Sequence, residues 1–338
     1  MSERRSVSQI LKWVGGITAV LSLIFGVAQL WNSVFGFTSK RRHVNELLAI
    51  GRVQLEQGDY RAAWASDSAA GLLAGDDHAV RRAQEDVAMA WLEESRLAEG
   101  ESFSGLASRL TPVLQRGLLD AKGQRKADLL AHLGWAEFLR SRDGAGGRMP
   151  DSLYRQALAV DSQNVYAHAM LGHWVLWRRG SLDEARAHFA AALAQGRLHG
   201  FVRHMQVAAL SNARDDPAGD ELVRVANDMR VHNEPLDDQT RSALGTVYFF
   251  RATGDSASLR RLLTAVPAPD HLKTFQWVYG DNGGDSLVNH YLLGLLQEAA
   301  GERDAALRTL HTVRQEPSLS PRLKLGAAAA IKRLSRPR

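Results

Sequence analysis

The sequence predicts an all-α protein, with an N-terminal transmembrane helix, an α-solenoid of about seven helical hairpins and a C-terminal capping helix. Three observations support this prediction. The 338 residues include only 9 prolines and 7% aromatic residues, which favours helices over a β-sandwich. An uncharged stretch stands near the N-terminus. A pattern of glycines and alanines recurs through residues 44–317, as it does in repeat proteins.

The uncharged stretch runs from Trp13 to Ser39 and has a lysine at each end. It is longer than the roughly 20 residues that a helix needs to cross the hydrocarbon core of a bilayer. We therefore expect a basic tail at 1–12, a transmembrane helix at 13–37 and a basic juxtamembrane linker at 38–43. A cleaved signal peptide and a buried globular helix are the alternatives, although the stretch has only a poor cleavage site.

This segment predicts a single-pass membrane protein that contacts the lipid bilayer through residues 13–37. The Ala- and Arg-rich composition favours a bacterial inner membrane. Basic residues are almost equally numerous on the two sides of the segment, and the slight excess on the C-terminal side favours a cytoplasmic body.

The net charge of +5 comes from the two ends of the chain. Residues 1–43 hold six basic residues and one acidic residue, and residues 317–338 hold six basic residues and no acidic one. The body between them holds 30 basic and 36 acidic residues. Because this body is acidic, we exclude nucleic acid as a partner. The absence of cysteine also excludes disulfides, thiolate-held metals and a cysteine nucleophile.

Three segments of the body share one pattern, which starts near residues 47, 169 and 292. Each predicts a first helix with a small residue on its packing face, a turn that contains glycine, and a second helix with an alanine near its start. The central glycines let a neighbouring helix approach, the turn glycines supply φ > 0, and the alanines stand where two helices cross. The residues that carry the pattern are Gly51, Gly58, Ala63, Gly172, Gly180, Ala185, Phe189, Gly294, Gly301 and Ala306.

This pattern resembles that of the tetratricopeptide repeat family, in which hairpins of two helices stack into a superhelix. The resemblance is specific in the three segments above and weaker around Gly134 and Gly245. The spacing between successive central glycines leaves room for two degenerate repeats, at 79–117 and 199–231.

The repeats together predict about seven hairpins across residues 44–317. A loop expansion at 143–150 lengthens one of them, and an irregular insert at 271–285 precedes the last. A basic capping helix and tail at 318–338 would cover the exposed end of the array, as a solenoid requires.

The side chains that could carry chemistry form no recognisable constellation. His168 and His173 stand five residues apart, so they fall on different faces of a helix and cannot ligate one metal ion as an i, i+4 pair does. Residues 281–285 do not continue into a calcium loop. The sequence also lacks a phosphate-binding loop and the nucleophile elbow of hydrolases. We therefore expect no enzymatic activity, no cofactor and no metal ion.

The resemblance implies a binding groove on the concave face, lined by two positions of each first helix. These are the residue after the central glycine and the residue four positions further on. Such a mixed aromatic and polar lining suits an extended or helical peptide. The alternative is that the tryptophans only fill space between repeats. The candidate partner-binding residues are Arg52, Glu56, Trp135, His173, Trp177 and Leu295.

The sequence thus predicts a membrane-tethered scaffold or adaptor that recruits a protein or peptide partner in the groove of the superhelix. A regulatory or sensory subunit of a membrane complex, in which the solenoid transmits a signal, is the alternative. A homo-oligomer stays open as well, since glycines in the predicted span can mediate helix pairing. The sequence does not identify the partner.

Overall fold

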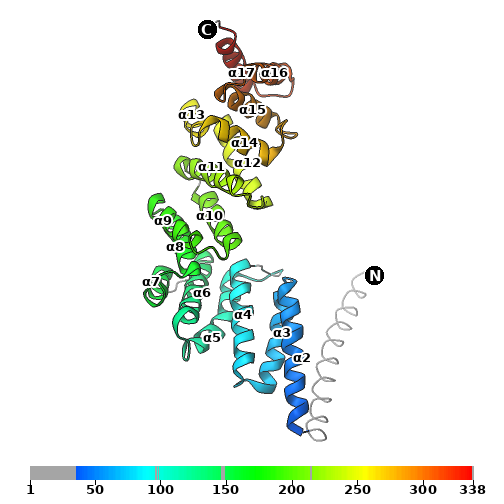
Figure 1. Cartoon of the computed structure of the whole chain (residues 1–338), viewed down its shortest axis with the longest axis vertical. Helices are drawn as coiled ribbons and strands as arrows, with labels where there is room; N and C mark the ends of the chain where they lie inside the picture. Colours follow the sequence, from blue (N-terminus) through cyan, green and yellow to red (C-terminus); the bar gives the residue numbers. More distant parts are fainter. Residues whose placement is uncertain (1–35, 96, 98, 146–148, 214, 337–338) are drawn as a thin grey trace, which may run out of the picture. The chain divides into compact units, whose positions relative to one another are not determined.

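The computed structural model describes residues 36–95, 97, 99–145, 149–213 and 215–336. In that part of the chain, sixteen α-helices follow one another and there is no strand (Figure 1). They form two compact units, which meet in sequence between Met149 and Pro150. This boundary falls within the predicted loop expansion at 143–150.

Unit 1 contains five helices, and each packs against the next along the chain. In addition, α2 contacts α4 and α4 contacts α6, so these three helices form a row. Leucine and phenylalanine side chains, among them Leu92, Leu110 and Phe138, are buried in the core of this unit. The helices are α2 (Gly36–Glu56), α3 (Tyr60–Ala74), α4 (His78–Glu94), α5 (Phe103–Leu118) and α6 (Gly123–Arg142).

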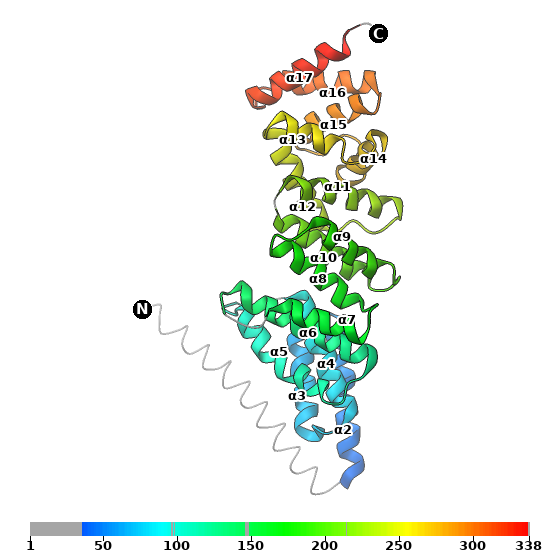
Figure 2. The ribbon, with the colours of Figure 1, turned by 90° about the vertical axis from the view of Figure 1, so that its left-hand side faces the viewer.

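Unit 2 contains eleven helices, and five of them form a row in which each helix contacts the next member. In this row α8 contacts α10, α10 contacts α12, α12 contacts α15, and α15 contacts α17 (Figure 2). The helices are α7 (Pro150–Val160), α8 (Val165–Trp177), α9 (Leu182–Leu193), α10 (His199–Ala213), α11 (Asp216–Val231), α12 (Asp238–Thr253), α13 (Ser256–Leu263), α14 (Ala268–Tyr279), α15 (Leu287–Ala299), α16 (Arg303–Gln315) and α17 (Pro321–Leu334).

The turns of three hairpins share one geometry. After α2 and α15, Gly58 and Gly301 have φ of 73° and 83°, and the next amide returns to a carbonyl of the last helical turn. This is the Schellman closure of a helix, which favours glycine at the residue with positive φ. After α8 the corresponding residue is Arg179, with φ of 58°. Gly180 follows it and donates to the carbonyl of Val175 at 2.7 Å, so the prediction that Gly180 supplies the positive φ was wrong by one residue.

The central glycines and the alanines stand at close approaches between helices. A Cβ on Gly172 would lie 3.2 Å from the backbone oxygen of Ala185 and from the ring of Phe189. On Gly294 it would lie 2.7 Å from Leu310. Ala63, Ala185 and Ala306 are fully buried, and Gly134 is buried in α6. Small residues at these positions therefore set the distance between the two helices of a hairpin.

The insert predicted at 271–285 is not irregular throughout, because its first part belongs to α14. His271, Leu272, Phe275 and Val278 recur at helical spacing and are buried. This apolar face packs against α11 and α15. Only the stretch after Tyr279 forms a turn.

No described helix is long and apolar enough to cross a membrane. The two helices of twenty residues or more, α2 and α6, carry charged side chains along their length, such as Arg42 and Glu46 in α2. This finding contradicts the predicted localisation as a single-pass membrane protein. Residues 1–35, with the predicted basic tail and most of the predicted span at 13–37, lie outside the described residues.

Candidate functional site

Exposed aromatic side chains lie on α8 and α12, two helices of the row that runs from α8 to α17 in unit 2. Trp177 ends α8 and is 40% exposed, and its ring stacks on that of His173 with centroids 6.5 Å apart. His173 itself is buried. The exposed basic residues Arg178 and Arg179 follow directly, so the end of α8 combines an aromatic face with positive charge.

Two further aromatic residues lie side by side on α12. Phe249 and Phe250 are 51% and 64% exposed, with ring centroids 5.8 Å apart. They point outward because Leu244, Tyr248 and Ala252, at a spacing of four residues, form the buried face of the helix. These phenylalanines are not among the partner-binding residues predicted from the sequence. Phe250 nevertheless follows Gly245 by five residues, as Trp177 follows Gly172, so the signal was present.

The other predicted groove residues differ in exposure. Arg52 and Glu56 of α2 are largely exposed and pair with each other at 3.0 Å, one helical turn apart. Trp135 of α6 is buried, and its indole Nε1 donates to the carbonyl of Leu92 at 2.8 Å, which links α6 to α4. Leu295 of α15 is buried as well. Partner contact by these residues stays a prediction.

A buried pair of titratable groups joins α12 to α14. The Tyr248 hydroxyl lies 2.9 Å from Nε2 of His271, whose Nδ1 faces the carbonyl of Leu263 at 3.4 Å. Burial lowers the pKa of His271 to about 4, so its ring is neutral at pH 7 and Nε2 accepts a hydrogen bond from the Tyr248 hydroxyl. Both side chains are fully buried, which makes this pair a packing element.

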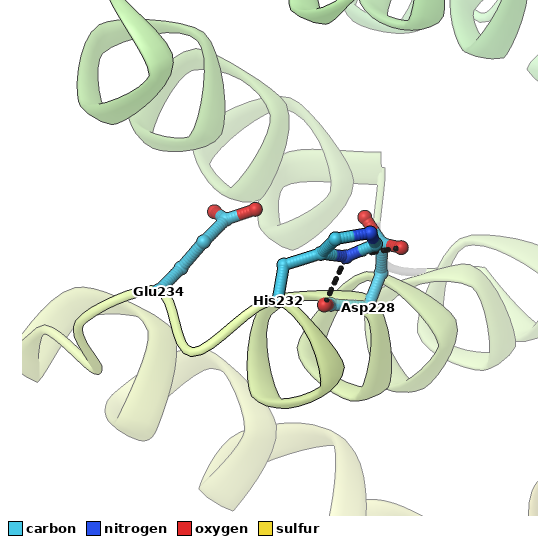
Figure 3. Close-up of side chains that lie close together, drawn as sticks. All are labelled: Asp228, His232 and Glu234. Carbon is cyan, nitrogen blue, oxygen red and sulfur yellow. Dashed lines mark hydrogen bonds and ion pairs between the residues drawn. The ribbon is translucent and has the colours of Figure 1, made fainter.

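One group of side chains has the composition of a metal site: Asp228, His232 and Glu234, at the end of α11 and just after it (Figure 3). His232 Nδ1 donates to the backbone carbonyl of Asp228 at 2.9 Å. The guanidinium of Arg203 already lies against both carboxylates: it donates to the two oxygens of Glu234 at 2.8 and 2.9 Å and also pairs with Asp228. One buried arginine therefore offsets part of the negative charge of the two carboxylates.

No family model and no curated protein matches the chain. Among solved structures, the chain is similar to a tetratricopeptide repeat protein from Parabacteroides merdae ATCC 43184, with 11% sequence identity and a TM-score of 0.41. The match covers 87% of this chain and 100% of the other. At that identity and TM-score the similarity carries no argument about function. The assignment of helical hairpins to this chain is based on the contacts between its own helices.

Proposed function

We propose that the chain is a scaffold that binds a protein or peptide partner, and that unit 2 holds this partner with the aromatic side chains of α8 and α12. The exposure of Trp177, Phe249 and Phe250 is the observation that carries the proposal. Single exposed apolar residues are common, but two exposed aromatic rings side by side, such as those of Phe249 and Phe250, are typical of interfaces, where they contribute much of the binding energy.

The chemistry of these positions indicates the kind of partner. The rings of Phe249 and Phe250 offer apolar area at a small cost in conformational entropy. The arginines after Trp177 offer hydrogen-bond donors to carboxylates. A segment with apolar anchor residues next to acidic residues would match both. Within unit 2, the buried His173 stacks on the ring of Trp177, so it would act on the partner through that ring. Arg52 and Glu56 are exposed on unit 1 and stay predicted partner contacts there.

The test is selection of peptides from a displayed random library on the full chain, followed by fluorescence anisotropy of the enriched peptides. We expect enriched peptides to contain aromatic or aliphatic anchors near acidic residues. In the triple variant Trp177→Ser, Phe249→Ser and Phe250→Ser, we expect their affinity to fall at least tenfold, because the anchors lose their partners.

The matched control is Leu325→Ser on α17 of the same unit, since Leu325 is 72% exposed and lies outside these two helices. It should leave the affinity unchanged, and circular dichroism should show that all variants keep their helices. Equal affinity for the triple variant and the wild type would contradict the proposal, and so would a library from which nothing is enriched.

A further inference from the structure

Two histidines face each other across the α8–α9 hairpin. His168 lies in the first turn of α8 and His188 in the second half of α9, and their Nδ1 atoms are 3.0 Å apart. The ring centroids are 5.3 Å apart, and both residues are partly exposed. Two imidazole nitrogens of partly exposed rings therefore lie within hydrogen-bond distance of each other.

The second nitrogen of His168 is fixed by the backbone. Its Nε2 lies 3.0 Å from the carbonyl oxygen of Ser162, which can only accept a hydrogen bond. Nε2 therefore carries the proton, and Nδ1 of the neutral ring keeps a lone pair, which accepts a hydrogen bond from Nδ1 of His188. Metal-ligating histidines have this arrangement, in which a carbonyl or carboxylate holds the nitrogen that does not bind the metal.

Burial, more than the surrounding charges, favours the neutral ring of His188. Burial lowers the pKa of His188, and the nearby His168 and Arg155 lower it as well, whereas Glu184 one turn earlier on α9 raises it. Because an imidazole must be deprotonated to bind a metal, a ring with a lowered pKa competes well at neutral pH.

We propose that His168 and His188 form a two-nitrogen site for a late first-row divalent metal ion, bound by Nδ1 of each ring. Two nitrogens at about 2.0 Å from an ion, in neighbouring positions of a square-planar or octahedral shell, lie about 2.8–2.9 Å apart. The distance of 3.0 Å between the Nδ1 atoms agrees with this geometry. Cu(II) binds nitrogen ligands most tightly in the first-row series, and water completes its shell.

The metal ion replaces a proton between the rings. Without an ion, His188 donates its Nδ1 proton to the lone pair of His168. When an ion binds, His188 carries that proton on Nε2 instead, so the neutral pair releases no proton. A rotation about the Cβ–Cγ bond of His188, a torsion with a broad energy minimum, directs its lone pair to the ion.

Within the part of the chain that the structure describes, Asp228, His232 and Glu234 form a group that could compete for the metal ion (Figure 3). A cation there would have to displace Arg203, whose side chain is only 7% exposed. Displacement would leave a buried guanidinium without its carboxylate partners, which is costly. His232 therefore provides the matched control.

The experiment titrates Cu(II) into the full chain in a glycine buffer that competes for weakly bound copper. Binding is followed by the visible absorption of Cu(II) and by its electron paramagnetic resonance spectrum. We expect one bound ion with two nitrogen ligands in the wild type. The variants His168→Gln and His188→Gln should each weaken binding at least tenfold, and His232→Gln should bind as the wild type does.

A footprint on the unsubstituted protein keeps the test independent of how the variants fold. One equivalent of Cu(II) should slow the modification of His168 and His188 by diethylpyrocarbonate, measured by mass spectrometry, and should leave His232 unaffected. The proposal is overturned if glycine removes all copper, if both glutamine variants bind as the wild type does, or if His232 is the protected residue.

Discussion

In three hairpins, the same position of the second helix lies against the central glycine of the first helix. The side chain at this position differs among the three hairpins. The position lies four residues after the buried alanine. In unit 2, Phe189 faces Gly172 and Leu310 faces Gly294. In unit 1, Asp67 faces Gly51 in the α2–α3 hairpin. Phe189, Leu310 and Asp67 are all at most 1% exposed, so one repeat position holds two apolar side chains and one carboxylate.

The environment of the Asp67 carboxylate does not favour its charged form. The Oδ1 atom of Asp67 is buried and has no hydrogen-bond partner among the described residues. Burial and, to a smaller extent, the charge of the neighbouring Asp86 together raise the pKa of Asp67 to about 6. At pH 7 the folded protein therefore holds a largely ionised acid in a site that two other hairpins use for apolar packing, and this opposes folding.

Unit 2 contains a buried acid that is paired with basic side chains. Asp220 of α11 is 4% exposed, and it accepts from the guanidinium groups of Arg251 at 3.0 Å and Arg261 at 2.8 Å. Burial raises its pKa, and the charge of Arg251 opposes that rise. The comparison indicates that the α2–α3 hairpin gives up stability at a position where the α8–α9 and α15–α16 hairpins gain it.

The largest expected effect comes from removing the apolar side chain. Phe189→Ala should lower the free energy of unfolding of the α8–α9 hairpin by about 3–5 kcal/mol, because it leaves a cavity against Gly172. Asp67→Ala should leave the stability of α2–α3 unchanged or raise it. Hydrogen exchange with mass spectrometry, peptide by peptide, measures both in the full chain. Equal losses in the two variants would contradict the comparison.

A smaller effect is expected from filling the space above the glycine. In Gly294→Ala, the new Cβ would lie 2.7 Å from Cγ and Cδ2 of the fully buried Leu310. Overpacking costs about 1–3 kcal/mol, and the better helix propensity of alanine returns about 1 kcal/mol, so the net loss should be at most about 2 kcal/mol.

Gly200→Ala is the matched control for Gly294→Ala, because a Cβ on this helical glycine would have open space around it. This variant should keep or gain stability. Denaturation of the two variants by urea, followed by circular dichroism, gives the difference. If Gly294→Ala is as stable as Gly200→Ala, then Leu310 does not define the approach of α15 and α16.

The repeat pattern made the all-helical hairpins predictable, because small residues at fixed spacing report where two helices meet. It placed the positive φ of the turn after α8 at the wrong residue, because Arg179 adopts the conformation that the pattern assigns to a glycine. It also missed the helical start of the insert, because residues 271–285 were predicted to be irregular, whereas His271, Leu272, Phe275 and Val278 form the buried face of α14. In both places the three-dimensional context outweighed the local signal.

The candidate sites were less predictable, for two reasons. The groove positions taken from the family pattern do not distinguish a buried ring such as that of Trp135 from an exposed one such as Phe250. The histidine pair requires the register of a hairpin. Gly172 lies against Ala185, and counting four residues back from the first and three forward from the second leads to His168 and His188. A search within one helix could not find this pair.

The smallest expected effect is a pH response of opposite sign in the two hairpins. The pKa of Asp67 is about 6 in the folded protein and near 3.8 when unfolded, so between these values the folded state holds more protons. Lowering the pH from 7 to 5 should therefore stabilise α2–α3 by about 1 kcal/mol. His188 has a lowered pKa when folded, so the unfolded state takes up the proton first and α8–α9 should lose stability.

Asp67→Asn separates this response from other acids of unit 1. Asparagine has nearly the same shape and does not titrate, so the gain of α2–α3 on acidification should disappear in this variant. Above pH 7 the variant should be more stable than the wild type by up to about 1 kcal/mol, because the amide is uncharged but still needs hydrogen bonds. Hydrogen exchange at pH 5, 6 and 7, corrected for intrinsic rates, measures these shifts. An unaltered pH response in Asp67→Asn would assign the proton to another group, and the contrast between the hairpins would then be one of packing alone.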